Sequence, residues 1–120
     1  MEWIYMNRIL LHLEGLAVLL FSLYLYSDFQ FSWVLFIVLI FAPDVSMVGY
    51  LINKKVGAVL YNFIHTYSLA LLVIVCGLLF SNQLVLALGL VLTAHIGMDR
   101  MLGYGLKYPT DFKDTHLNRV

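Results

Sequence analysis

Apolar residues along the chain form four long runs that are separated by short polar segments. The runs cover residues 9–26, 31–52, 56–80 and 84–102. A helix that crosses a bilayer needs about 20 mostly apolar residues, and each run is close to that length. The pattern therefore predicts a single membrane domain over residues 1–120, with four transmembrane helices and a polar tail over residues 103–120.

The polar segments between the runs are turns of only a few residues. They cover residues 27–30, 53–55 and 81–83. Connections this short make consecutive helices antiparallel neighbours. The predicted fold class is therefore all-α, a polytopic membrane protein built as an antiparallel four-helix transmembrane bundle.

The amino-acid composition agrees with lipid as the surrounding solvent. Hydrophobic residues make up 62% of the chain and charged residues 12%, whereas soluble domains carry about 25% charged residues. The formal net charge is zero, and no Lys/Arg cluster is interleaved with aromatic residues, which argues against a nucleic-acid partner. The expected partners are membrane lipids.

The positions of the cations predict the orientation in the membrane. The Lys and Arg residues are Arg8, Lys54, Lys55, Arg100, Lys107, Lys113 and Arg119. In the four-helix arrangement they all lie on one side, and the turns on the other side carry only Asp28. Lys and Arg are retained on the cytoplasmic side, so we expect a multi-pass protein of the inner (plasma) membrane with both termini in the cytoplasm.

Ionisable residues interrupt the apolar runs at similar depths. Glu14, Asp44, His65 and His95 each lie in a different run, and Asp99 lies near the end of the fourth. At about 1.5 Å of rise per residue, the first four lie roughly 7 to 14 Å below the cytoplasmic boundary. Because ionisable groups at membrane depth are costly and usually functional, we expect one site that opens toward the cytoplasm.

The residue types at this depth are those that bind metal ions. His95 and Asp99 are four residues apart and share a helix face, a spacing that suits two ligands of one ion but also an ordinary salt-bridged pair. Together with Asp44 and His65 they combine imidazoles and carboxylates, which Zn, Mn and Fe ions select. We therefore expect a Zn-like divalent ion held by His65, His95, Asp99 and Asp44.

A proline precedes one of these candidate ligands. Pro43 interrupts the second run, and a proline inside a helix frees backbone carbonyls. At membrane depth such a break is tolerated where the chain is buried in protein or lines a wet cavity. Asp44 would then project from a helix break. The alternative is a simple proline kink beside a hydrogen-bonded aspartate.

Four further residues are candidates for contacting the substrate or orienting the ligands. Tyr61 and Asn62 share a face with His65, where they would orient its ring or form hydrogen bonds between helices. Arg100 follows Asp99 directly. His116 lies in the tail, which either folds over the cytoplasmic mouth or stays in solvent.

Several motifs resemble a known family. They are Ala42–Tyr50, Tyr61–Tyr67, Ala94–Arg100, Gly103–Pro109 and Thr115–Leu117. Together they resemble a small bacterial integral-membrane family catalogued only as a domain of unknown function, over nearly the whole chain. That resemblance implies a membrane protein but no activity.

The order of the motifs is also similar, more distantly, to inner-membrane proteins described as metal-dependent hydrolases. Their pattern has Pro-Asp-x-Asp, a central Thr-His, and a late His-x-x-x-Asp followed by a proline segment. Here Pro43-Asp44 and His95 with Asp99 match. Ser46 replaces the second Asp, and His65 precedes a threonine instead of following one, so the ligand set implied by the resemblance is altered.

The favoured hypothesis is a metal-dependent hydrolase that acts on a lipid or other membrane-associated substrate from the cytoplasmic side. In this hypothesis Glu14 and Asp44 are the catalytic carboxylates, with Glu14 as general base or ligand-orienting group. One alternative is a small proton- or ion-coupled transporter, which would require a homodimer. Another is a haem protein with His65 and His95 as axial ligands.

Overall fold

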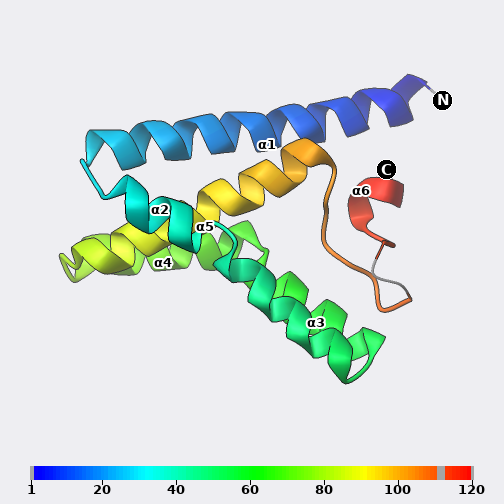
Figure 1. Cartoon of the computed structure of the whole chain (residues 1–120). Helices are drawn as coiled ribbons and strands as arrows, with labels where there is room; N and C mark the ends of the chain where they lie inside the picture. The colour runs from blue at the N-terminus through cyan, green and yellow to red at the C-terminus, as the bar shows by residue number, and fades with distance from the viewer. Residues whose placement is uncertain (1, 111–112, 120) are drawn as a thin grey trace.

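The computed structural model describes residues 2–110 and 113–119, and it is helical almost throughout (Figure 1). Its elements are α1 (Glu2–Asp28), α2 (Trp33–Leu39), the 3₁₀ helix η1 (Ala42–Leu51), α3 (Lys54–Ile64), α4 (Tyr67–Leu79), α5 (Gln83–Leu102) and α6 (His116–Arg119). Within the described ranges, the β-type pairing is an isolated bridge between Lys107 and Thr115. The all-α prediction is confirmed for this part of the chain.

Helix α5 is the centre of the fold. It packs along α1 on one side and along α4 on another, and most of its side chains are buried. The contact with α1 is close because glycines lie in it: a Cβ on Gly97 would come within 2.8 Å of the Leu19 nitrogen. Helices η1 and α3 pack on each other and extend away from the α1–α5 pair (Figure 1).

Three segments are long and apolar enough to cross a membrane. They are Tyr5–Asp28, Trp33–Leu51 and Gln83–Leu102. Helices α3 and α4 form a fourth such segment if the two are counted together as one span. Large apolar side chains are widely exposed on the outer surface, for example Leu51 at 85% and Phe80 at 78%. These features support a membrane protein.

The second predicted helix changes its geometry at Pro43. The α-helix ends at Leu39, and η1 continues from Ala42 as a 3₁₀ helix. The backbone N–H of Asp44 donates to the carbonyl of Phe41 (3.0 Å), one residue short of the α-helical partner Ile40. Pro43 has no N–H to offer, so the Ile40 carbonyl has neither its α-helical nor its 3₁₀ partner. The interruption expected at Pro43 is therefore present.

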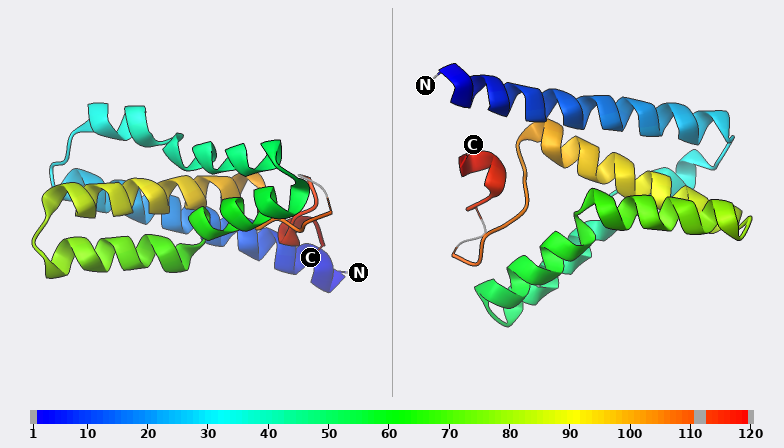
Figure 2. Two further views of the ribbon diagram at one scale, coloured as in Figure 1. Left: turned by 90° about the horizontal axis from the view of Figure 1, so that it is seen from below. Right: turned by 180° about the vertical axis from the view of Figure 1, so that it is seen from behind.

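The third predicted helix is not continuous, so the prediction of one helix over residues 56–80 is wrong. Helices α3 and α4 meet at a bend of 41°, which Figure 2 shows from behind (right view). His65 ends α3, and Thr66 has the extended backbone of an N-cap. Arg100 Nη2 donates to the His65 carbonyl at 2.9 Å, where an α-helix would supply a backbone N–H. A contact from α5 therefore stabilises this break.

The polar tail begins where α5 ends in a Schellman motif. Gly103 has a left-handed backbone (φ 97°), its N–H donates to the Arg100 carbonyl, and the N–H of Tyr104 donates to the Asp99 carbonyl. The tail then returns toward α3 and ends in α6 (Figures 1 and 2). Gly103 thus ends α5.

An ion pair within the tail gives a prediction about pH. Hydrogen bonds from Arg119 and Thr110 lower the pKa of the Asp114 carboxyl from 3.8 to about 2. A lowered pKa in the folded state means that this contribution to tail structure is complete above the ordinary pKa and is lost as the pH falls through about 2. In ¹³C NMR of the detergent-solubilised protein, Arg119→Gln should move the Asp114 titration upward. Lys113→Gln is the control and should leave it in place.

Candidate metal centre

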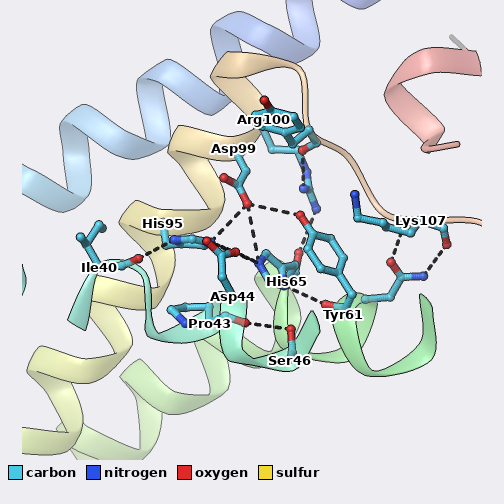
Figure 3. A network of polar contacts seen from close by, with 12 residues as sticks. Ile40, Pro43, Asp44, Ser46, Tyr61, His65, His95, Asp99, Arg100 and Lys107 are labelled. Atoms are coloured by element: carbon cyan, nitrogen blue, oxygen red, sulfur yellow. Dashed lines mark hydrogen bonds and ion pairs between the residues drawn. The ribbon is translucent and has the colours of Figure 1, made fainter. Parts of the chain in front are cut away.

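Four ionisable side chains meet where the two helix breaks face α5. Asp44 comes from the start of η1, His65 from the junction of α3 and α4, and His95 and Asp99 from one face of α5 (Figure 3). One ligand atom from each of the four lies within 4.8 Å of the other three. These residues form the His/Asp cluster. The convergence expected for these four residues is present.

The distances within the His/Asp cluster are those of ligands around one small ion. The Nε2 atoms of His65 and His95 are 3.2 Å apart, and each lies 3.2 Å from Asp44 Oδ1. Asp99 Oδ2 is 3.2 Å from His95 Nε2 and 3.7 Å from His65 Nε2. A tetrahedral ion with bonds of about 2.0–2.2 Å separates its ligand atoms by about 3.3–3.6 Å. These five separations are close to those values.

Backbone carbonyls determine which ring nitrogens face the centre of the cluster. His65 Nδ1 lies 2.9 Å from the Tyr61 carbonyl, and His95 Nδ1 lies 2.5 Å from the Ile40 carbonyl (Figure 3). A carbonyl only accepts hydrogen bonds, so both Nδ1 atoms carry hydrogen. In the neutral rings each Nε2 then presents a lone pair. Two lone pairs and two carboxylate oxygens facing one point require a cation or protons between them.

Burial makes this requirement stronger. The side chains of His65 and His95 are 0% exposed and that of Asp99 is 10% exposed. Tyr61 stacks on the His65 ring, with 3.7 Å between ring centroids, and its hydroxyl donates to Asp99 Oδ2 at 3.4 Å. Negative charge in such surroundings is unfavourable unless it is paired. Asp44, at 34%, is the most exposed member.

A cavity of about 340 Å³ opens beside the His/Asp cluster. It is lined by Phe41, Asp44, Met47, Tyr61, Met98, Asp99, Leu102, Tyr104 and Lys107. Both carboxylates of the cluster border it, whereas the two histidines lie behind them. This cavity is called the cluster cavity. A ligand bound in it would approach the cluster from the side of its two carboxylates.

Arg100 and Asn62 support the site without joining the cluster. Arg100 donates to the His65 carbonyl and, through Nη1, to the Tyr104 carbonyl (3.0 Å). Asn62 forms two hydrogen bonds with the Lys107 backbone, accepting from its N–H (2.6 Å) and donating to its carbonyl (2.7 Å). Asn62 therefore holds the tail in place, and Tyr61 is the neighbour that orients His65.

Glu14 and His116 lie elsewhere. Both line a second cavity of about 280 Å³ together with Arg100 and Tyr67, and Glu14 is exposed on α1. His116 Nδ1 accepts a hydrogen bond from the Leu106 N–H at 2.8 Å. The structure therefore does not bring Glu14 into the His/Asp cluster. Glu14 lies on a face of α1 that borders Arg100 and Tyr67 and not the cluster.

Two features of the site escaped the sequence reasoning. From the sequence, Lys107 is a cytoplasmic cation like the others, because nothing local distinguishes it from Lys113. The sequence does indicate that the Ile40 carbonyl lacks a helical donor, because Pro43 stands three residues later and has no N–H to donate to it. Sequence reasoning identified the break but not the histidine ring that binds the freed carbonyl.

Fold and site together define a class: an all-helical protein with membrane-length apolar helices around a buried His/Asp cluster. The chain belongs to the family described as a domain of unknown function (DUF4260), whose sequence model matches residues 8–120. All four residues of the cluster lie within that range. The expected family is confirmed, and its description names no activity. No curated protein and no solved structure matches the chain.

The ring geometry predicts the tautomers of the two histidines. In metal-free protein, at a pH where the rings are neutral, ¹⁵N NMR should show hydrogen on Nδ1 of both His65 and His95. Pro43→Ala supplies an N–H that competes for the Ile40 carbonyl, so it should reduce the Nδ1–H form of His95 and spare His65. Hydrogen on Nε2 of both wild-type rings would contradict the assignment.

Proposed function

We propose that this protein is a metal-dependent hydrolase of the membrane, with a Zn-like ion held in the His/Asp cluster. The observation that carries the proposal is that ligand atoms of His65, His95 and Asp99 lie 3.2–3.7 Å from one another, with both imidazole lone pairs directed inward. The carboxylate of Asp44 lies beside them, 3.2 Å from both Nε2 atoms. Two imidazoles with two carboxylates suit Zn and, more weakly, Mn or Fe.

The membrane arrangement proposed for the chain has four antiparallel spans. Helices α3 and α4 act as one bent span beside the three continuous candidates. The site then lies toward the end of the bundle that carries the cations, which we assign to the cytoplasm together with both termini. Irregular backbone at Pro43 and His65 is supported there because protein groups satisfy it.

The distances favour a small ion over haem. Axial ligands on opposite sides of a haem iron, at about 2 Å each, would be about 4 Å apart with the porphyrin between them. Here the two Nε2 atoms are 3.2 Å apart, and carboxylate oxygens also contact them. A divalent ion would balance both carboxylates, whereas protons alone would have to be shared among atoms that all approach one point.

The residues divide into ligands and a base by their exposure. His65, His95 and Asp99 are buried and hydrogen-bonded in place, which suits the three protein ligands of a catalytic zinc site. Asp44 borders the cluster cavity and is the most exposed, so it can accept the proton of the attacking water. The bound ion would supply a water of lowered pKa and polarise the scissile group. Asp44 thereby takes the base role that the sequence suggested for Glu14.

Metal content and activity test this assignment separately. The wild type should hold roughly one ion per chain, and His95→Ala should lose it because a ligand is removed. His116→Ala is the control histidine and should keep it. Asp44→Asn should retain metal but slow hydrolysis by about 10²–10⁴-fold, since the base is lost. Metal is measured by mass spectrometry and hydrolysis on ester and phosphoester lipids in mixed micelles.

Two results would contradict the proposal at different levels. If the wild type takes up no Zn, Mn or Fe after incubation, the cluster is not a metal site. Proton transfer would then be the role left for the cluster. Stoichiometric metal without hydrolysis of any lipid in the panel, and with His95→Ala lowering only thermal stability, would make the ion structural.

The proposed topology has its own test. Reporter fusions after Asp28 and after Asn82 should read external, and a fusion at the C-terminus should read cytoplasmic, because the cations lie on one side of four spans. If the C-terminus is external, the chain cannot have both an even number of spans and a cytoplasmic N-terminus.

A further inference from the structure

Two adjoining cavities lie along α5, on the side away from the cluster cavity. Helices α1 and α4 each pack along α5 but share little direct contact with each other (Figure 2). The cavity of about 280 Å³ that contains Glu14 and His116 lies here, and a third cavity of about 490 Å³ lies next to it. Tyr67 lines both, so the two cavities meet at its side chain. Together they are called the α1–α4 groove.

The third cavity is the apolar part of the α1–α4 groove. Phe21 from α1 and Leu71 from α4 line it and are 62% and 56% exposed, so this part is continuous with the outer apolar surface. The hydroxyls of Ser22 and Thr93 also line it, but both donate to carbonyls of their own helices, at 2.8 and 2.7 Å. The space therefore suits an alkyl chain.

The cavity of about 280 Å³ is the polar part, and it contains a buried cation. Arg100 is 7% exposed, and its two Nη atoms donate to the carbonyls of His65 and Tyr104. Within the described residues, no carboxylate forms an ion pair with its guanidinium. A buried charge is costly unless it is paired. The guanidinium therefore favours an anion in this cavity.

Two further side chains at this cavity can donate to such an anion. The hydroxyl oxygen of Tyr67 is buried and has no hydrogen-bond partner among the described residues. Burial and the nearby charge of Arg100 lower the pKa of His116, so its ring is neutral near pH 7. Since His116 Nδ1 accepts from the Leu106 N–H, its Nε2 carries the hydrogen. A guanidinium, an O–H and an N–H around one space are typical of phosphate binding.

Glu14 adds a negative charge to the exposed side of the same cavity. A simple anion beside Arg100 would be repelled by this carboxylate. A ligand that carries both a phosphate and an ammonium can instead place one near Arg100 and the other near Glu14. The charges of the cavity thus favour a zwitterionic head group.

The order of the two parts along the helices agrees with a lipid in the bilayer. Glu14 and Phe21 on α1, and Arg100 and Thr93 on α5, are each seven residues apart, or about 10 Å along the helix. In the proposed arrangement the polar part lies toward the cation-bearing end of the bundle and the apolar part toward the middle of the bilayer. A lipid of the cytoplasmic leaflet has its head group and chains in the same order.

We propose that the α1–α4 groove binds a phospholipid with an ammonium head group. Arg100, Tyr67 and His116 bind its phosphate. Glu14 pairs with its ammonium, and an acyl chain lies in the apolar part between α1 and α4. This site is separate from the His/Asp cluster, and the inference goes beyond the proposed function without resting on it.

Four probes test the assignment on the protein in neutral detergent. Lysophosphatidylethanolamine carries the phosphate, the ammonium and one chain. The matched lysophosphatidylglycerol lacks the ammonium, monoacylglycerol also lacks the phosphate, and glycerophosphoethanolamine lacks the chain. Native mass spectrometry or thermophoresis should show lysophosphatidylethanolamine binding at least about tenfold more tightly than monoacylglycerol or glycerophosphoethanolamine, and severalfold more tightly than lysophosphatidylglycerol.

Variants connect the phosphate preference to the polar part. Arg100 is left unchanged because it also stabilises the break at His65. Tyr67→Phe removes only the hydroxyl, and His116→Ala removes the ring, so each should lower the preference over monoacylglycerol by about threefold to tenfold. Tyr5→Phe is the matched control, since Tyr5 is exposed on α1 and lines neither cavity.

Two other variants test the ammonium and the chain. Glu14→Gln should remove the preference over lysophosphatidylglycerol. Ala17→Leu fills the apolar part from an exposed position, so it should weaken lysophosphatidylethanolamine binding and spare glycerophosphoethanolamine. Val34→Phe adds bulk to an exposed position on α2 and should bind like the wild type.

Several results would overturn the inference. Equal binding of lysophosphatidylethanolamine and monoacylglycerol would exclude phosphate recognition, and equal binding of glycerophosphoethanolamine would replace the lipid with a soluble phosphodiester. A wild type that binds lysophosphatidylglycerol as tightly as lysophosphatidylethanolamine would exclude the pairing with Glu14. An unchanged preference in both Tyr67→Phe and His116→Ala would place the lipid elsewhere. The wild-type comparison decides alone if these variants do not fold. Chelator-treated and Zn-incubated samples should show the same preference, so failure of the metal site would leave this inference standing.

Discussion

The structure depends on backbone carbonyls that two helix breaks leave without helical partners. In an apolar protein an unpaired carbonyl costs free energy comparable to a lost hydrogen bond, and in lipid several kcal/mol. The Ile40 carbonyl is bound by His95 and the His65 carbonyl by Arg100, both from α5. The breaks are therefore stabilised by the helix that carries half of the His/Asp cluster.

The same hydrogen bonds orient the two histidine rings of the cluster. When His95 satisfies the Ile40 carbonyl through Nδ1, its other nitrogen faces the cluster, and the Tyr61 carbonyl has the same effect on His65. Tyr61 also contributes its ring to His65 and its hydroxyl to Asp99. The contacts that stabilise the fold therefore also orient the side chains of the cluster.

The tail extends this arrangement beyond the helices. Asn62 on α3 binds the backbone of Lys107 much as a neighbouring strand would, and brings a cation next to the acidic part of the cluster cavity. An apolar wall, a pair of carboxylates and a lysine then surround one space of about 340 Å³.

The sequence by itself determined the features that depend on neighbours along the chain. Apolar runs predicted the all-α fold, Pro43 predicted the first break, and the spacing of His95 and Asp99 predicted a shared helix face. The second break could not be predicted, because neither His65 nor Thr66 disrupts a helix, and the stabilising contact comes from Arg100 on another element. The sequence predicted how far along its helix each of Glu14 and Asp44 lies. It did not predict how each helix is rotated about its own axis. That rotation is set by packing, for example at Gly97 against α1, so only the tertiary structure separated Glu14 from the cluster and brought Lys107 to it.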